Sequence, residues 1–400
     1  MTQEPNATHH FLIRVAELLH RYGTPSHRLE RVMEKISRTL GIPSVFLYTP
    51  TALVASLGSG ADERTYMRRV DAGAIDADKL NRFDEILERL EAREITVSEA
   101  SAEMEAAAAA KPIYAGWMTA LACGVACASV AVFFGGSAVE VLLSGLIGVC
   151  IAGIEVIQAK LKWETGLLFP VSGFVAAFLS LAFARWITPI DDRLVTLASV
   201  VVLLPGFTLT IAMTEITVGH LSAGVARLAG ASVTLFTIFL GVAIAWRLGG
   251  DWRVLPDDPI HLPAIASLLA TLVAPASFAV LFRVPMKLWP IIFFVSLSGF
   301  WSAKWGGNYG VEVGAFLGAT VVGCCSNFYA RVTDKPAMVP VAPGLLVLVP
   351  GSLGYRSLTA LLNRETIEGV EFAFGMVLVA MALVGGLLAA SAIVPPKRIL

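Results

Sequence analysis

Apolar residues follow two different patterns on either side of residue 111. Before it they recur every three or four positions, or gather in short β-branched runs, as in the helices and strands of a small domain. After it they form runs of roughly 18–22 residues, the length needed to cross about 30 Å of hydrocarbon. The sequence therefore predicts a membrane all-α body of about ten transmembrane helices behind a small N-terminal α/β domain.

The polar segment, residues 1–111, is expected to contain four helices and three strands. Ser26 follows Pro25 and is placed to cap the second helix. The predicted helices cover Thr8–Tyr22, Ser26–Leu40, Asp76–Ala92 and Ser98–Ala110, and the predicted strands cover Val45–Tyr48, Ala52–Leu57 and Thr65–Val70.

The apolar segment, residues 112–400, is predicted to span the membrane ten times, in two groups of five separated by a loop at 247–261. The spans are Ala115–Phe134, Val139–Ala159, Gly166–Trp186, Leu194–Ile216, Val225–Trp246, Leu262–Phe282, Leu288–Ala303, Gly310–Tyr329, Met338–Leu361 and Val370–Ile393.

Composition supports this division. Hydrophobic residues make up 56% of the chain and charged residues only 15%, with a mean hydropathy of +0.72. Of the 61 charged residues, 31 lie in the first 111 positions, so the remaining 289 residues are far less polar. The net charge of −1 excludes a generally basic nucleic-acid binder, and the abundance of apolar residues excludes a disordered chain.

The N-terminal domain is expected on the cytoplasmic side of a multi-pass protein of the inner (plasma) membrane. Met1–His10 is polar, unlike a signal peptide. With the domain inside, the basic residues of inner and outer loops number ten against seven, which agrees with the positive-inside rule. The inner set is Lys111, Lys160, Lys162, Arg227, Arg283, Lys287, Arg331, Lys335, Lys397 and Arg398; the outer set is Arg185, Arg193, Arg247, Arg253, Lys304, Arg356 and Arg364.

Cysteine and histidine give no metal or disulfide pattern. All five cysteines lie in apolar stretches, where cysteine behaves as a small hydrophobe. Four histidines of the polar segment, His9, His10, His20 and His27, match no familiar zinc spacing. We expect no metal and no cofactor. Ser26-His27 beside Glu30 leaves a hydrolase as an alternative, although no G-x-S-x-G motif is present.

The two halves of the apolar segment look related. An Ala-Arg pair at 184–185 is followed by Leu204-Pro205-Gly206 in the fourth span, and an Ala-Arg pair at 330–331 is followed by Val349-Pro350-Gly351 in the ninth. Five spans per repeat would insert the second copy upside down, which predicts an inverted repeat over about 112–250 and 260–395. Interrupted helices at corresponding positions are typical of the binding site of a secondary transporter.

These interruptions are the predicted substrate site. Proline removes a backbone hydrogen bond, so each break frees carbonyls and amides that could grip an amino acid. We predict that the fourth and ninth spans are unwound there and that the breaks face each other near mid-membrane. The candidate substrate-binding residues are Pro205, Gly206, Thr208, Thr210, Pro350, Gly351, Ser352 and Asn308.

Carboxylates inside the spans are the candidates for handling protons, because ionisable groups are costly there. Those considered are Glu140, Glu155, Glu215, Glu312 and Glu371. Glu215 is the first choice, since it closes a P-G-F-T-L-T-x-x-x-x-E run, and Glu312 is the second. In this hypothesis Glu215 exchanges a proton while the substrate occupies the Pro205–Thr210 break.

The chain resembles the threonine/serine exporter family. The resemblance begins in the run from Leu18 to Glu30, continues through the strand pair near Thr49-Pro50-Thr51, and returns at Leu203-Leu204-Pro205-Gly206 with Gly224-x-x-Arg227, and at Val349-Pro350-Gly351. It covers nearly the whole chain. Pro25 and Leu29 depart from the small residue and the valine expected there, which leaves the substrate open.

The resemblance implies an inner-membrane carrier with ten spans that exports small hydroxyl amino acids at the expense of the proton gradient. Two-subunit relatives are associated with dicarboxylate export, which makes a dicarboxylate the rival substrate. A membrane-anchored hydrolase is the rival class. The expected partners are an amino-acid substrate, protons and membrane lipid, without nucleic acid, and a homo-oligomer is left open.

Overall fold

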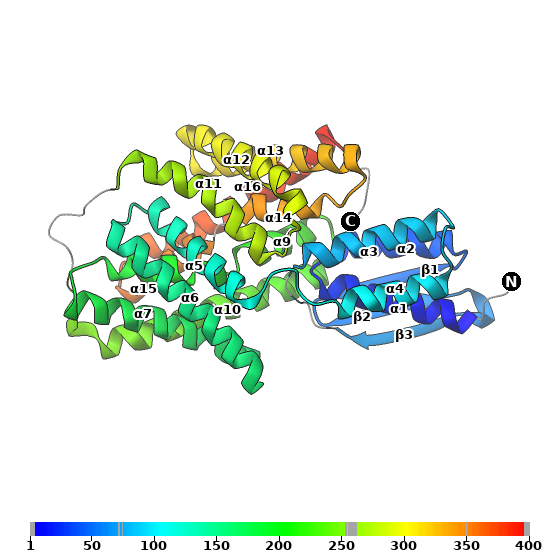
Figure 1. Cartoon of the computed structure of the whole chain (residues 1–400), viewed down its shortest axis with the longest axis horizontal. Helices are drawn as coiled ribbons and strands as arrows, with labels where there is room; N and C mark the ends of the chain where they lie inside the picture. The colour runs from blue at the N-terminus through cyan, green and yellow to red at the C-terminus, as the bar shows by residue number, and fades with distance from the viewer. Residues whose placement is uncertain are drawn as a thin grey trace.

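The computed structural model describes residues 5–70, 73, 75–252, 254, 262–346, 348 and 351–395. Two parts can be followed in Figure 1: a domain of helices and strands that carries the N-terminus, and a larger helical bundle. The predicted fold class, a helical membrane body with a small α/β domain, is confirmed. The domain limits at 1–111 and 112–400 stay a prediction.

Three strands and four helices make up the N-terminal domain. The strands β1 (Ser44–Thr49), β2 (Ala52–Leu57) and β3 (Arg64–Arg69) form an antiparallel sheet in the order β1-β2-β3. Side chains alternate along β2, and its inward residues Leu53, Ala55 and Leu57 are buried. Helices α1 (Pro5–Arg21), α2 (Ser26–Thr39), α3 (Ala77–Glu91) and α4 (Val97–Ala109) share this core. Every element predicted for this segment is present.

Side-chain caps stabilise the starts of two domain helices, α3 and α4. Asp76 accepts a hydrogen bond from the amide of Lys79 at α3, and Thr96 caps α4 reciprocally with Glu99. The prediction that Ser26 caps α2 is wrong. Pro25 is the capping residue, and Ser26 is the first residue of the helix. A carboxylate of the bundle takes over the role of the missing side-chain cap, as described below.

Nine helices among the described residues are long and apolar enough to cross a membrane, and one bent pair adds a tenth span. The prediction of about ten spans is therefore confirmed: nine or, with the bent pair, ten candidates lie at the predicted positions. Eight are single helices: α5 (Gly116–Phe133), α6 (Ala138–Leu161), α7 (Leu168–Trp186), α10 (Leu221–Leu248), α11 (Ala264–Leu281), α12 (Trp289–Gly306), α13 (Val311–Thr333) and α16 (Thr366–Ile393). The other two are α8 (Asp192–Val200) with α9 (Gly206–Thr217), and α14 (Met338–Leu346) with α15 (Gly351–Leu362).

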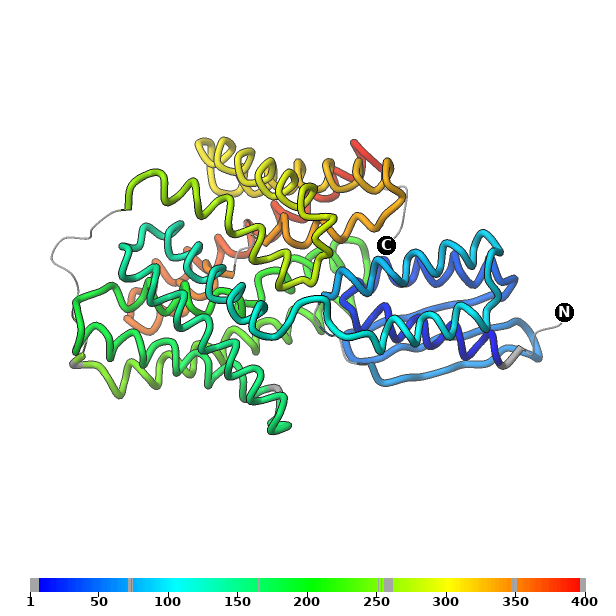
Figure 2. Tube along the Cα trace, in the orientation of Figure 1, coloured from blue at the N-terminus to red at the C-terminus, as the bar shows by residue number. Residues whose placement is uncertain are grey.

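The two halves of the bundle pack in the same manner. In the first half α7 packs on α10, α9 on α10 and α6 on α8; in the second half α13 packs on α16, α15 on α16 and α12 on α14. Figure 2 shows the cyan-to-green first half beside the yellow-to-red second half. The shared pattern of neighbours supports a repeat, and its inversion stays a prediction.

Glycines allow the closest helix contacts in both halves. A Cβ atom on Gly241 of α10 would overlap the carbonyl oxygen of Pro170 in α7. A Cβ atom on Gly386 of α16 would overlap the carbonyl oxygen of Phe316 in α13. Small residues let membrane helices approach closely, and here they do so at equivalent helix pairs.

The N-terminal domain rests on one end of the bundle. The amides of Ala77 and Asp78, at the start of α3, donate hydrogen bonds to the carbonyls of Phe282 (3.0 Å) and Arg283 (3.2 Å). The Arg283 guanidinium also forms an ion pair with Asp76 at 2.8 Å. A second ion pair joins Glu85 to Lys335. The loops after α11 and α13 therefore lie at the domain end of the bundle, as the predicted inner loops require.

Candidate functional site

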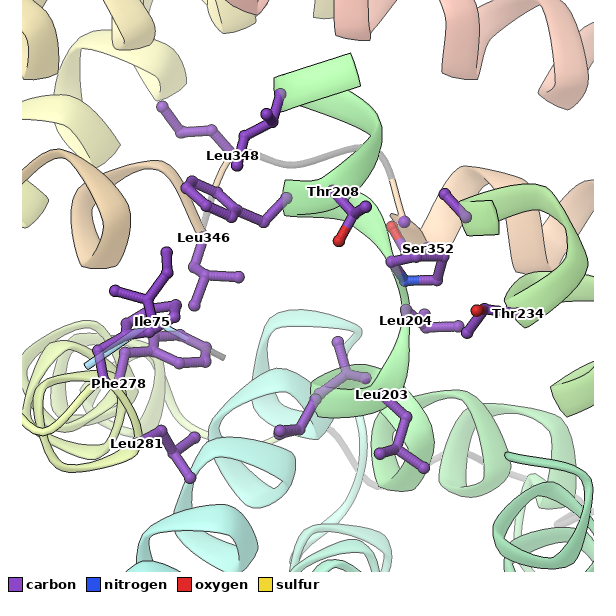
Figure 3. Close-up of a pocket in the computed structure, with 18 of the residues that line it drawn as sticks. Ile75, Leu203, Leu204, Thr208, Thr234, Phe278, Leu281, Leu346, Leu348 and Ser352 are labelled. Atoms are coloured by element: carbon purple, nitrogen blue, oxygen red, sulfur yellow. The ribbon is translucent and has the colours of Figure 1, made fainter. Parts of the chain in front are cut away.

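A cavity of about 1260 Å³ lies between the two halves of the bundle. It exceeds the about 300–1,000 Å³ typical of small-molecule pockets. Its lining begins at the N-terminal domain with Thr24 and extends to Gly307, beyond the end of α12 that is remote from the domain. Figure 3 shows apolar side chains around its middle, with the hydroxyls of Thr208, Thr234 and Ser352 among them.

The fourth span is interrupted beside this cavity. A short 3-10 turn follows α8, Leu204 has an extended backbone with ψ 130°, and α9 begins at Gly206. The two helices are bent by 54°. Pro205 has no amide proton, so the regular helical hydrogen bonding cannot continue through it. The predicted unwinding at Pro205-Gly206 is confirmed.

The start of α15 lies against the break in the fourth span. A Cβ atom on Gly351, the first residue of α15, would lie 3.1 Å from the Cβ atom of Leu204 and 3.3 Å from the Cα atom of Gly206. The predicted site residue Pro350, with Val349, lies outside the described residues. The starts of α9 and α15 thus meet at the cavity. Each start carries unpaired amides and a partial positive charge, as at any helix N-terminus.

The predicted substrate residues divide into three groups. Pro205, Thr208, Gly351 and Ser352 line the cavity. Gly206 and Thr210 are buried behind this lining, and the Thr210 hydroxyl donates a hydrogen bond to the carbonyl of Gly206 (3.1 Å). Asn308 is exposed in the turn after α12, away from the break.

Glu215 is fully buried near the end of α9, but it does not line the cavity. Its carboxylate accepts hydrogen bonds from Nε (3.0 Å) and Nη2 (3.2 Å) of Arg227 in α10. The amide of Ser26, at the start of α2, donates a third hydrogen bond to it at 2.9 Å. Glu215 therefore ties the N-terminal domain to the bundle and holds Arg227, which does line the cavity.

The other carboxylates considered from the sequence take different positions. Glu312 is exposed in the first turn of α13, and Glu371 is exposed in α16. Glu140 accepts hydrogen bonds from the amides of Ser137 (2.6 Å) and Asp191 (2.7 Å), so it stabilises the start of α6 and the loop before α8. Glu155 lines the cavity.

The lining contains more positive than negative side chains. Arg227, Arg283 and Lys304 line the cavity, and Glu155 is the one carboxylate among the described lining residues. The lining therefore offers more charged hydrogen-bond donors than charged acceptors to a solute that enters it.

Two of these cations are paired with carboxylates that are absent from the lining. Arg227 pairs with Glu215, and Arg283 pairs with Asp76. These arginines were not selected as site residues from the sequence. The available signal was the Gly224-x-x-Arg227 motif, whose arginine follows Glu215 by 12 residues in the chain.

Histidines gather where α2 meets the start of α10. The rings of His27 and His220 lie 6.3 Å apart, and Nδ1 of His220 lies 3.3 Å from the carboxylate of Glu30. Burial, together with the nearby Arg28 and Arg31, lowers the pKa of His27 to about 3. His27 is therefore neutral at physiological pH. Within the described part of the chain, no three His, Cys, Asp or Glu side chains are grouped to hold a metal ion.

We expect the protein to be less stable at pH 5 than at pH 7 because of His27. The His27 ring gains a proton below about pH 6.5 in the unfolded protein but only near pH 3 in the folded protein. The contribution of neutral His27 to the free energy of unfolding is therefore fully present above pH 6.5 and is lost as the pH falls. The loss by pH 5 is about 2 kcal/mol. Thermal unfolding of the full chain in detergent at both pH values would measure it. His27→Gln should lose less stability on acidification, and an equal loss in both proteins would contradict the prediction.

Two profiles described as threonine/serine exporter, ThrE, match the chain, one over residues 10–249 and the other over residues 267–393. The chain is 27% identical over 365 residues to Pheromone-regulated membrane protein 10 of Eremothecium gossypii, covering 87% of this chain and 49% of that protein. It is 26% identical over 416 residues to the protein of the same name in Saccharomyces cerevisiae, covering 97% and 54%.

A further relative is an uncharacterized protein of Schizosaccharomyces pombe, 24% identical over 430 residues that cover 96% of this chain and 51% of the relative. The chain thus spans about half the length of these curated relatives. No solved structure matches it.

Proposed function

Because the chain belongs to the threonine/serine exporter family, we propose that it exports small hydroxyl amino acids, threonine or serine, at the expense of a proton gradient. It is a multi-pass membrane protein, as an exporter must be. The proposal places the N-terminal domain in the cytoplasm and the bundle in the inner (plasma) membrane. It requires no cofactor and leaves a homo-oligomer open.

The observation that carries this proposal is the meeting of the starts of α9 and α15 at the cavity. The N-termini of α9 and α15, with their first-turn amides and partial positive charges, meet at one place. Such a place favours binding of the carboxylate of an amino acid. Carbonyls released by the interruption of the helices suit its ammonium group. The hydroxyls of Thr208 and Ser352 lie in the same lining and suit the hydroxyl of threonine or serine.

Each predicted site residue has a role in this proposal. Pro205, Gly206 and Gly351 shape the place where α9 and α15 meet, Thr208 and Ser352 contact the substrate, and Thr210 supports Gly206 from behind. Pro350 lies outside the described residues. Asn308 would act at the remote mouth of the cavity. Glu215 is the proposed proton-exchanging group, with Glu312 as the second candidate.

A dicarboxylate is the second candidate substrate. The charged donors of Arg227, Arg283 and Lys304 outnumber the single carboxylate of Glu155 in the lining, and a solute with two carboxylates could accept hydrogen bonds from more than one of them. The hydrolase alternative gains no comparable support, because Ser26 is fully buried and its hydroxyl has no hydrogen-bonding partner among the described residues.

Transport by purified protein in lipid vesicles tests the proposal. Vesicles would be offered labelled threonine, serine, alanine and succinate, with and without an imposed pH difference. We expect accumulation of threonine and serine against their gradients, abolished by a protonophore and absent from protein-free vesicles. Accumulation of succinate alone would replace the amino-acid proposal by the dicarboxylate one, and accumulation of none of them would reject both.

A further inference from the structure

A partly engaged arginine lies in the cavity wall at the domain end. Arg227 uses Nε and Nη2 to bind Glu215, while Nη1 has no hydrogen-bonding partner among the described residues. Its side chain is only 13% exposed. The two-pronged contact with Glu215 fixes the plane of the guanidinium, so the remaining donors keep a fixed direction.

An unpartnered hydroxyl lines the same cavity from the N-terminal domain. Thr24 lies in the turn between α1 and α2, is 4% exposed, and its hydroxyl has no partner within the described part of the chain. Gly23 before it has φ +93°, a conformation that glycine adopts without strain, and this turn fixes Thr24 at the cavity. A buried polar group without a partner is costly, so its presence points to a ligand.

Thr24 and Arg227 are held close to one another by Glu215. The Ser26 amide, two residues after Thr24, donates its hydrogen bond to the carboxylate that Arg227 grips. Two extended residues span at most about 7 Å, so one small solute is long enough to contact both Thr24 and the Arg227–Glu215 ion pair. The wall at this end comes from both parts of the molecule.

We propose that Thr24 and Arg227 form a second binding site, at the domain end of the cavity, for the carboxylate group of the transported solute. This inference rests on the proposed function and adds a place where the solute binds before or after the central breaks. Both groups can donate hydrogen bonds, and a guanidinium bonds a carboxylate strongly. Arg283 adds a second positive charge to this end of the lining.

The hydrogen-bond donors of Thr24 and Arg227 suit a carboxylate better than they suit the ammonium of an amino acid. Glu215 and Asp76, the carboxylates paired with the two arginines, lie behind them and are absent from the lining. A cation entering here would meet guanidinium groups first. The site therefore selects for a carboxylate, whether it belongs to an amino acid or to a dicarboxylate.

The test measures thermal stabilisation of the purified full chain by sodium acetate, L-threonine and L-threoninamide, with sodium chloride as the salt control. We expect stabilisation by acetate and threonine but little by threoninamide, which lacks the carboxylate. Thr24→Val and Arg227→Lys should each need about 10-fold more acetate or threonine for the same shift, because each removes a hydrogen bond to a charged group. Thr271→Val is the matched control, since Thr271 is buried, bonded to the Ser267 carbonyl, and absent from the lining.

The Thr24→Val variant distinguishes a role of Thr24 in ligand binding from a role in protein stability. Without ligand it should unfold at the same temperature as the unaltered protein or higher, because it removes a hydroxyl that has no partner among the described residues. A structural role for Thr24 would instead lower that temperature. Repeating the acetate series in Gly351→Val, which fills the central break, isolates the domain-end site.

An unchanged acetate response in Thr24→Val, or no acetate response in the unaltered protein, would overturn the proposed site. Failure of the proposed function gives a different result. Threonine and serine would not be transported, but acetate would still stabilise the unaltered protein and would still stabilise the Thr24→Val and Arg227→Lys variants less.

Discussion

The Glu215→Gln variant is expected to lose gradient-driven export by at least about 100-fold while keeping slow exchange of substrate between the two sides of the membrane. Glutamine preserves the size of the side chain and one oxygen for the Ser26 amide, but it cannot change its charge. Its NH₂ group would also face the Arg227 guanidinium, where a carboxylate now accepts two hydrogen bonds. Vesicles with an imposed pH difference would measure accumulation, and counterflow without a gradient would measure exchange.

Glu371→Gln is the matched control for this prediction, because Glu371 is exposed and does not line the cavity. Since removing one partner of a buried ion pair costs about 3–5 kcal/mol, folding must be measured as well. The double variant Glu215→Gln, Arg227→Gln leaves no unpaired charge at this pair and should fold without regaining coupled export. If Glu215→Gln vesicles still accumulate substrate under a pH difference, Glu215 is not the coupling group, and loss of accumulation in Glu312→Gln would transfer the role to Glu312.

Gly351→Val is expected to lower both coupled export and exchange by about 100-fold, because it crowds the start of α15 against the break in the fourth span. A Cβ atom there already comes within 3.1 Å of the Leu204 Cβ atom and 3.3 Å of the Gly206 Cα atom, and valine adds two methyl groups. Gly351→Ala, with the Cβ atom alone, should give a smaller loss. Initial rates of uptake into vesicles would measure both variants.

The control for the break is Gly375→Val in α16. Gly375 is also helical, but a Cβ atom on it would meet nothing within 4 Å. The same substitution there should leave both rates nearly unchanged. Equal rates in Gly351→Val and Gly375→Val would show that the contact between the start of α15 and the break has no part in transport.

Features that depend on local sequence could be predicted. The ten spans follow from hydrophobic length, and the interruption at Pro205 follows from the missing amide proton. The sheet of the domain was also predictable, because Ala52–Leu57 alternates in burial as its apolar pattern indicates.

Features that depend on distant partners could not be predicted. Ser26 was expected to cap α2 with its own hydroxyl, but Glu215, 189 residues away, accepts the hydrogen bond of its amide instead. Glu215 was expected to face the substrate, and the structure turns it toward Arg227 and the domain. No periodicity or spacing relates these three residues, because only the packing of α2 against α9 and α10 brings them together.

Helix α9 carries Gly206 of the break at one end and Glu215, which contacts the N-terminal domain, near the other end. Gly206 lies at the break and Glu215 lies on the N-terminal domain, nine residues apart, or about 14 Å along a helix. An α-helix of this length moves as a rigid rod, so a tilt at one end displaces the other. The position of the N-terminal domain is thereby coupled to the break: a shift of the domain would move the break in the fourth span, and a movement of the break would displace the domain.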